Sequence, residues 1–308
     1  MAILAEYQYM GRRIIYLTNP ISGTRNKKAL LKLVEQLTIE EGIPYEIVPT
    51  NAAGDYSFLK EKIKTEGITD IIICGGDGTV SQAAASLRFE NVNFGIIPMG
   101  SGNGLAFAAK IPKKAEKALD IIFKGQASFV DAFSINGTFS CMLCGLGFDA
   151  QVAHDFAKQK TRGLGTYIQQ TISNFFKAKP YSFELTADEK TTAAEAYFIS
   201  IANSNQFGNQ FTIAPRASLR DGLMDIVVVK KMSKLRLLWS VLKQIKYGET
   251  EDYDEQIFHK KDVAYFQTAK LIIKNIDNAP LHIDGDPVSS SGEFMIEIIP
   301  NAFKLIQP

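Results

Sequence analysis

The sequence predicts a protein of two domains, first an open parallel α/β sheet and then a mostly antiparallel β domain. Its 308 residues are about twice the roughly 150 residues of a typical domain. Over the first 125 residues, short apolar segments alternate with amphipathic helices, which is typical of a parallel sheet covered on both faces. From about residue 129 onward, strand patterns follow one another with few helices between them. We therefore expect an α/β domain over residues 1–128 and a second domain over residues 129–299.

The elements of the α/β domain follow from apolar periodicity. The clearest helix is expected at residues 27–41, because Leu30, Val34 and Leu37 lie on one helical face. The last helix is expected to end at Lys124, since Gly125 suits the position just after a helix. Together the patterns predict strands at residues 14–18, 45–48, 70–74 and 93–97, and helices at residues 27–41, 52–66, 80–87 and 113–124.

The second domain begins with a hairpin pattern. Asn136-Gly137 suits a type I′ turn, and it separates strand-like residues 130–135 from strand-like residues 138–143. Further strands are expected at residues 181–187, 195–203, 223–229, 270–275 and 294–299, with helices near residues 163–179 and 233–247.

The composition excludes several classes of protein. Lys plus Arg number 34 and Asp plus Glu number 33, a formal charge of +1, whereas binding of nucleic acid by charge needs a clear basic excess. No apolar run is long enough for a transmembrane helix, and the first residues lack the pattern of a secretory signal. The three cysteines are too few for a disulfide framework and favour a reducing, cytoplasmic location.

The strongest local feature is the string Gly75-Gly76-Asp77-Gly78-Thr79, which follows a buried strand and precedes a helix. Glycines let the backbone approach a phosphate closely, and the start of a helix offers N–H groups to an anion. An aspartate there would repel phosphate unless Mg²⁺ lay between them. The string therefore predicts a site for a metal-bound phosphate.

Two further loops have the same character. Residues 19–23 read NPISG and follow the first strand, and residues 98–104 read PMGSGNG and follow the fourth. Because the carboxyl ends of parallel strands share one edge of a sheet, we expect all three loops to lie along that edge. None of them has the spacing of a Walker A loop or of a dinucleotide fingerprint.

The trio NPISG, GGDGT and PMGSGNGLA resembles the catalytic domain of the diacylglycerol kinase superfamily. That superfamily includes sphingosine kinases, ceramide kinases and the bacterial soluble lipid kinases. The similarity continues in the same order through GLGFDA at 145–150, DGLMD at 221–225 and IDGD at 283–286, and so covers nearly the whole chain.

The resemblance implies an N-terminal α/β domain on which the tail 300–308 packs, a C-terminal antiparallel β-sandwich, and an active site in the cleft between them. It also implies ATP as phosphoryl donor and a structural Mg²⁺ bound by Asp221 with the carbonyl groups of Ser218 and Leu223. The residues expected to bind ATP are Asn19, Pro20, Ile21, Ser22, Gly23, Thr50, Gly75, Gly76, Asp77, Gly78, Thr79, Val80, Ser81, Gln82 and Ser101.

Two aspartates are the expected catalytic residues. By the resemblance, the proton acceptor is the last residue of an Asp-Gly-Glu, and this chain has Asp286 there, one methylene shorter. Asp77 is expected to organise the catalytic Mg²⁺ and the phosphates. Asp-Gly-Asp-Pro is also good turn chemistry, which leaves a purely structural role for Asp286 open. Asp225 is left out of the expected site.

The expected reaction is phosphorylation of a hydroxyl group on an amphipathic lipid, with diacylglycerol as the first candidate. A sphingoid base or ceramide is the close alternative, because GSGNGLA is more similar to the loop of sphingosine and ceramide kinases. Phosphatidylglycerol stays open as well. NAD kinase, which shares GGDGT, and an inactive sensor of lipid or nucleotide are further alternatives.

Two weaker features concern partners and packing. Cys141 and Cys144 form a C-x-x-C, but residues three apart on a strand face opposite sides, which favours core positions. Residues 230–247 combine six Lys and Arg with apolar residues at helical spacing, a pattern suited to transient contact with an anionic membrane surface. The sequence leaves the oligomeric state open, a dimer included.

Overall fold

The computed structural model describes residues 11–18, 27–51, 53–100, 102–159, 174, 178–205, 214, 216–233 and 263–308. The chain divides into two compact units, Met1–Val130 with Asn301–Pro308, and Asp131–Pro300. The sequence predicts these divisions at residues 128 and 299 instead.

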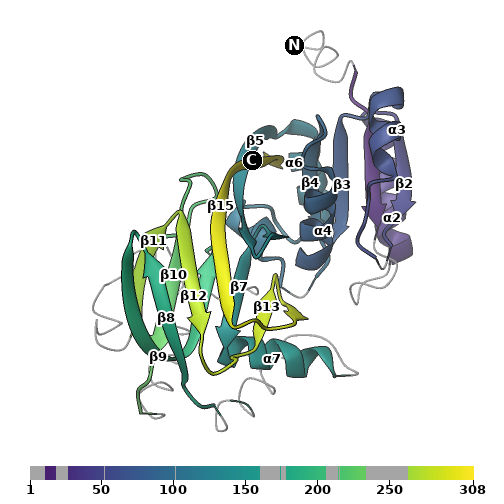
Figure 1. Ribbon diagram of the computed structural model, residues 1–308. Coiled ribbons are helices and arrows are strands. Elements are labelled where there is room, and N and C mark those ends of the chain that lie inside the picture. The colour runs from purple at the N-terminus through teal and green to yellow at the C-terminus, as the bar shows by residue number, and fades with distance from the viewer. Residues whose placement is uncertain are drawn as a thin grey trace. The chain divides into compact units, whose positions relative to one another are not determined.

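The first unit is a parallel α/β sheet (Figure 1). Its strands lie in the order β2 (Tyr45–Pro49), β1 (Ile14–Thr18), β3 (Asp70–Gly75) and β4 (Asn93–Pro98), and every neighbouring pair is parallel. Isoleucine-rich β3 is buried along its whole length, as expected for a strand whose two faces are both covered. The helices of the unit are α2 (Lys27–Glu40), α3 (Leu59–Glu66), α4 (Asp77–Leu87), α5 (Gly104–Ala108) and α6 (Ala115–Lys124).

The edge of this sheet beside β4 is completed by the far end of the chain. Strand β15 (Glu293–Gln307) runs parallel to β4 at Lys304 and Leu305, which lie opposite Asn93 and Phe94. The Phe94 and Phe303 rings make an edge contact with centroids 5.4 Å apart. Residues made last in the chain therefore belong to the core of the unit that is made first.

The helix predicted at residues 52–66 is wrong at its start, because α3 begins only at Leu59. In the preceding turn, Asp55 accepts hydrogen bonds from the backbone N–H and the hydroxyl of Ser57, at 2.8 and 3.0 Å. The amide of Asn51 donates to the carbonyl oxygen of Asp55 at 2.6 Å. These short polar side chains offer the backbone an alternative to the helix, which periodicity alone does not detect.

The second unit is an antiparallel β structure. One path of neighbours runs β14 (Asp286–Val288), β13 (Leu281–Ile283), β7 (Leu143–Gly147), β9 (Lys190–Ala202), β8 (Tyr181–Ala187), β12 (Lys270–Asn275) and the first part of β15. Strand β10 (Met224–Lys230) pairs with β9 and with β11 (Val263–Thr268). The side chains between the layers form one apolar core, which includes Phe133, Phe183, Ile226 and Phe294.

The predicted hairpin at Asn136-Gly137 is confirmed, but its second strand ends at Ser140 instead of residue 143. It joins the antiparallel strands β5 (Gln126–Ile135) and β6 (Thr138–Ser140), and both turn residues have positive φ angles, 47° and 80°. Helix α7 (Phe148–Ala157) and the short strands β13 and β14 were not predicted. Nearly all of the helices predicted near residues 163–179 and 233–247 lies outside the described residues.

Among the helices that the structure describes, none is both long and apolar enough to cross a bilayer.

Candidate active site

Two glycine-rich segments of the first unit lie side by side, residues 75–79 at the end of β3 and the start of α4, and residues 98–100 with 102–104; we call them the glycine loops. Gly75 ends β3 and Gly76 is the N-cap of the eleven-residue helix α4. The N–H of Met99 donates to the carbonyl oxygen of Gly75 at 2.9 Å. A Cβ atom added to Gly100 would lie 2.7 Å from the Cα of Gly76, too close for any side chain. Glycine at both positions therefore lets the two main chains meet at the start of α4.

At the start of α4, the residues that are accessible to a ligand are mainly glycines, which offer main chain and no side chain. Thr79, Val80 and Ser81 are buried, whereas Gly76, Asp77 and Gly78 are partly exposed. The first turn of a helix carries main-chain N–H groups that have no partner within the helix, and they attract anions. The residues present thus fit a polyphosphate, with the Asp77 carboxylate beside it as a hard oxygen ligand of the kind that Mg²⁺ prefers.

Asn103 was missed by sequence reasoning, although it lies within the second loop. It is only 2 % exposed, and it adopts the left-handed conformation with φ 57°. Its side-chain oxygen accepts the N–H of Gly100, and its side-chain N–H donates back to the Gly100 carbonyl, both at 2.8 Å. This reciprocal pair holds Gly100 against Gly76.

Thr50 lies at the same edge of the sheet, just after β2. Its N–H donates to the carbonyl oxygen of Thr18 at the end of β1, at 3.0 Å. The chain that follows packs on α4, because a Cβ on Gly54 would lie 2.6 Å from Cδ of Gln82. Ser86 of α4 also donates its hydroxyl to the Gly54 carbonyl at 3.2 Å. Thr50 and the segment Gly75–Gln82, two predicted parts of the nucleotide site, thus lie at the same edge of the sheet and are linked through Gly54 and α4.

The other predicted nucleotide residues are Asn19, Pro20, Ile21, Ser22, Gly23 and Ser101, and all of them lie outside the described residues.

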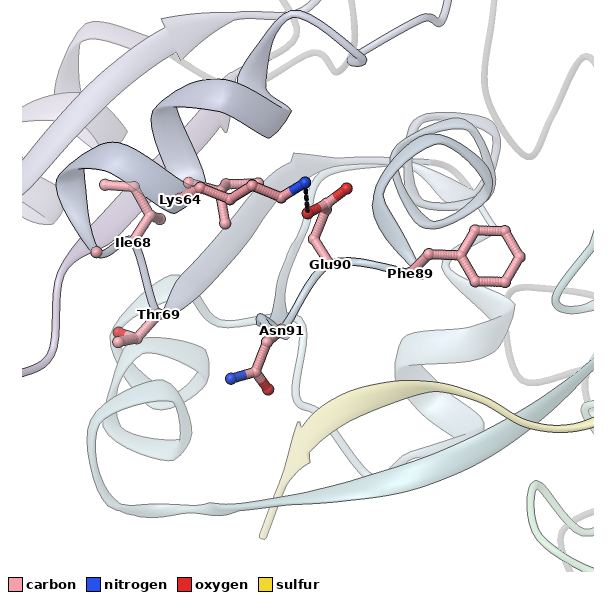
Figure 2. A pocket seen from close by; sticks show the side chains of 8 residues that line it. Lys64, Ile68, Thr69, Phe89, Glu90 and Asn91 are labelled. Carbon is pink, nitrogen blue, oxygen red and sulfur yellow. Dashed lines mark ion pairs between the residues drawn. The ribbon is translucent and has the colours of Figure 1, made fainter.

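A shallow hollow at the opposite edge of this sheet is separate from the glycine loops (Figure 2). Its lining includes Thr69 and Asn91, which precede β3 and β4, and an ion pair of Lys64 Nζ with Glu90 Oε2 at 3.6 Å crosses it. None of the predicted site residues lines this hollow.

In the second unit, Asp286 is the first residue of β14, directly after a tight turn. Asp284 and Gly285 form that turn with φ angles of 48° and 85°, and Ile283 pairs with Asp286 across it. Within Asp284-Gly285-Asp286, the first two residues therefore form the turn, and the third is the expected proton acceptor. Asp286 is exposed, as contact with a substrate requires.

Asp284, in contrast, is buried and accepts hydrogen bonds from several groups. The hydroxyl of Ser140 donates to Oδ1 at 2.7 Å, and the N–H groups of Met142 and Leu143 donate to the same oxygen at 3.1 Å each. The N–H of Cys141 donates to Oδ2 at 3.4 Å. The carboxylate of Asp284 therefore anchors the β13–β14 hairpin to residues 140–143.

This anchor accounts for the positions of Cys141 and Cys144, the C-x-x-C of the sequence. Cys141 and Cys144 are both buried, and neither forms a disulfide. Burial raises the pKa of the Cys144 thiol well above its usual value, and the carboxylates of Asp284 and Asp149 add to the effect. Cys141 contributes its main-chain N–H to the anchor, and both thiols lie in the core.

The predicted structural metal site lies on the loop before β10. Asp221 Oδ1 accepts the N–H of Leu223 at 3.1 Å. Asp131, itself buried, accepts the N–H of Gly222 at 2.8 Å and ties this loop to β5. Within the described residues, no three His, Cys, Asp or Glu side chains are grouped as metal ligands. The donors available, one carboxylate and main-chain carbonyls, are hard oxygen ligands of the kind Mg²⁺ prefers.

Asp225, left out of the expected site, lies beneath this loop. It is fully buried, and it accepts hydrogen bonds from the Tyr265 hydroxyl and from Gln267 Nε2, the latter at 3.3 Å. Burial raises the pKa of the Asp225 carboxyl, and the nearby charge of Asp221 acts in the same direction. The same Gln267 amide reaches Asp221 Oδ2 at 3.4 Å, so β11 links the two carboxylates.

The chain matches two family models, one in each part. Residues 13–135 match the diacylglycerol kinase catalytic domain. Residues 143–307 match the YegS C-terminal NAD kinase beta sandwich-like domain.

Two curated relatives are similar over nearly their whole length. A Citrobacter koseri protein named "Probable lipid kinase YegS-like" is 27% identical over 283 residues, which cover 87% of this chain and 88% of that protein. A Yersinia pestis protein of the same name is 26% identical over 97% of this chain and 98% of its own.

Solved structures share the fold. A diacylglycerol kinase from Bacillus anthracis has a TM-score of 0.73 at 20% identity, covering 96% of this chain and 97% of that chain. A second solved chain from the same organism has a TM-score of 0.78 at 21% identity.

Proposed function

This chain belongs to the lipid kinase family in which a diacylglycerol kinase catalytic domain precedes a YegS-type β-sandwich domain, and we propose that it transfers the γ-phosphoryl group of ATP to a hydroxyl group of an amphipathic lipid. Diacylglycerol is the first candidate acceptor, with phosphatidic acid as the product. Family membership supports kinase chemistry, and the acceptor is the part of the proposal that needs testing.

The observation that carries the proposal is the main-chain contact between Gly76 and Gly100 at the start of α4. Phosphoryl transfer depends on positioning the phosphates and on neutralising the charge that develops on them. The glycine loops supply N–H groups without side chains in the way, Asp77 lies within the first of them, and Thr50 lies at the same edge of the sheet. When bound, Mg²⁺ would be held by Asp77 and would neutralise phosphate charge, and a second, structural Mg²⁺ would be held by Asp221 with the carbonyls of Ser218 and Leu223.

Asp286 is the proposed general base. Its carboxylate accepts the proton of the lipid hydroxyl while the hydroxyl oxygen attacks the γ-phosphorus, and ADP leaves with the bridging oxygen. A base must be exposed and held in place, and Asp286 is exposed at the first position of a short strand whose turn is anchored by buried Asp284. The rigid turn supports the role despite the shorter side chain.

The substrate must be reached at a membrane surface, and residues 230–247 are the proposed contact. Of these, the structure describes 230–233, where Lys231 pairs with Glu195 at 2.8 Å. The proposal places the protein in the cytoplasm with transient contact to an anionic membrane.

A transfer assay with γ-labelled ATP tests the proposed function. The acceptor panel contains mixed micelles of diacylglycerol, sphingosine, ceramide or phosphatidylglycerol, and NAD in solution. NAD belongs in the panel because the C-terminal model is named after NAD kinase. The wild type is compared with Asp77→Ala, Asp286→Ala and Asp120→Ala, the last an exposed carboxylate whose only role shown is an ion pair with Lys124.

We expect a labelled lipid with the wild type and with Asp120→Ala, and none above background with the two catalytic variants. A labelled sphingoid base or ceramide would correct the acceptor and keep the mechanism. Label on NAD alone, or ATP binding without transfer to any acceptor, would overturn the lipid kinase proposal.

A further inference from the structure

A buried histidine–aspartate pair links the hairpin that carries Asp286 to helix α7. His282 of β13 is 1 % exposed and Asp149, in the first turn of α7, is 6 % exposed. His282 Nε2 lies 3.3 Å from Asp149 Oδ2. Polar groups that are removed from water to this extent are costly unless they are paired, so the pair has a structural or functional reason.

The hydrogen bonds assign the tautomer of the imidazole. The N–H of Gly285 donates to His282 Nδ1 at 3.3 Å. Because Nδ1 accepts, a neutral ring carries its proton on Nε2, and that proton is donated to Asp149. A chain of bonds therefore runs from the Asp149 carboxylate through the imidazole to the main chain of Gly285.

The surrounding backbone makes room for this pair. Gly145 of β7 lies opposite His282 in the strand register. A Cβ atom on Gly145 would lie 2.0 Å from Asp149 Oδ2 and 2.6 Å from His282 Nε2. Any side chain at residue 145 would therefore expel the pair.

Helix α7 binds the same hairpin a second time, at a different place. His154 Nε2 lies 2.8 Å from the carbonyl oxygen of Leu281, at the start of β13. His154 therefore supports the hairpin at its base, whereas His282 reaches the turn itself.

We propose that His282, held by Asp149, is a positioning residue for the transfer reaction. It fixes the N–H of Gly285 and with it the turn from which Asp286 projects, while Asp284 anchors the other side of the same turn. This inference rests on the proposed function, in which Asp286 is the general base. A base displaced by about 1 Å can lose on the order of 100-fold in rate, so the position of this turn affects kcat directly.

Two substitutions of His282 separate the two bonds. In His282→Asn, the side-chain oxygen takes the place of Nδ1 and can accept from Gly285, but the link to Asp149 is lost. In His282→Gln, the side-chain N–H takes the place of Nε2 and can donate to Asp149, but the acceptor for Gly285 is lost. His154→Gln is the control for general loosening of the hairpin.

We expect the two His282 variants to rank in opposite orders for stability and for activity. His282→Asn should melt at the lower temperature, because it removes the imidazole donor from the buried Oδ2 of Asp149, and should keep kcat close to wild type because it retains an acceptor for the Gly285 N–H. His282→Gln should melt higher than His282→Asn and lose about tenfold in kcat, as a displacement of the base by less than about 1 Å would cause, with an unchanged KM for ATP. His154→Gln should lower the melting temperature and leave kcat unchanged.

Amide hydrogen exchange at Gly285, measured by NMR on the full chain, gives a readout independent of catalysis. The Gly285 amide should stay protected in His282→Asn and exchange faster in His282→Gln. Equal protection in both variants, or kcat values that simply follow melting temperature, would overturn the inference. A wild type without transfer activity would refute the proposed function, and the exchange data would still decide whether His282 holds the turn.

Discussion

The glycine loops of the first unit and the β13–β14 hairpin of the second hold their functional groups by different means. At the glycine loops, main chain packs on main chain, with Gly76 and Gly100 in contact and a single buried amide, Asn103, fixing the second loop. At the hairpin, buried side chains hold the turn, Asp284 from one side and His282 with Asp149 from the other. A phosphate-binding surface requires main-chain N–H groups that a phosphate can approach closely. A catalytic carboxylate, in contrast, must be held in a fixed orientation.

The largest effect is expected at Asp286. It tests whether the hairpin contributes to the transfer step and not to nucleotide binding. Loss of a general base costs about 10²–10⁴-fold in rate, so Asp286→Ala should lower kcat by that factor and leave the affinity for a fluorescent ATP analogue unchanged. Asp77→Ala, at the glycine loops, should weaken nucleotide binding as well. Equal loss of nucleotide affinity in both variants would contradict the division of roles.

The next effect concerns the stability that buried side chains give the hairpin. Asp284→Ala removes the acceptor of four donors, and hydrogen bonds to a charged group contribute about 1.5–3 kcal/mol each, partly offset by desolvation of the carboxylate. We expect a loss of about 3 kcal/mol in the free energy of unfolding by urea, together with lower kcat. Asp284→Asn keeps one acceptor oxygen and should lose less. A variant as stable as wild type would show that the network does not hold the turn.

A smaller effect is expected where main chain meets main chain. Gly100→Ala places a methyl group 2.7 Å from Gly76 Cα, and overpacking of this kind costs about 1–3 kcal/mol. The KM for ATP should rise, and the kcat at saturating ATP should change less. Gly292→Ala is the matched control, because a Cβ there meets nothing within 4 Å. Equal behaviour of the two variants would show that the glycine contact has no role in nucleotide binding.

The smallest effect is expected at the three cysteines, whose thiols should not react with an alkylating reagent in the native protein. Burial raises the pKa of Cys74 to about 12, and Cys141 and Cys144 are buried as well. Because the thiolate is the reactive form, iodoacetamide at pH 8 should leave all three native thiols unmodified and should modify all three in denaturant, as counted by mass spectrometry. Rapid labelling of Cys74 alone in the native protein would show that the first unit opens more readily than the second.

The difference between the two regions also explains what the sequence could predict. Glycines that follow a buried strand form a local pattern, so the loop at residues 75–79 and its place at the sheet edge could be predicted from neighbouring residues. The partners of the hairpin are distant in sequence: Ser140 and Asp284 are 144 residues apart, and Asp149 and His282 are 133 apart. Only the folded chain brings them together, so their roles could not be predicted.

The same reasoning applies to the elements. Strands β1, β8 and β12 were predicted with the bounds that the structure has, because their apolar pattern is uninterrupted. The predicted start of α3 was wrong because the side chains of Asn51 and Asp55 form hydrogen bonds with the local backbone. Strands β13 and β14 have three residues each, too few to show a period, and they depend on the turn at Asp284 and Gly285.

The pairing of β15 with β4 has a consequence for synthesis on the ribosome. Residues 301–307 are translated after the entire second unit, yet Leu305 is fully buried beside β4, and Phe303 packs on Phe94. Until they emerge, the nascent first unit has an open strand edge and an exposed apolar patch, a state that chaperones bind and in which strands mispair. Folding of the first unit is therefore completed after translation of the second unit rather than domain by domain.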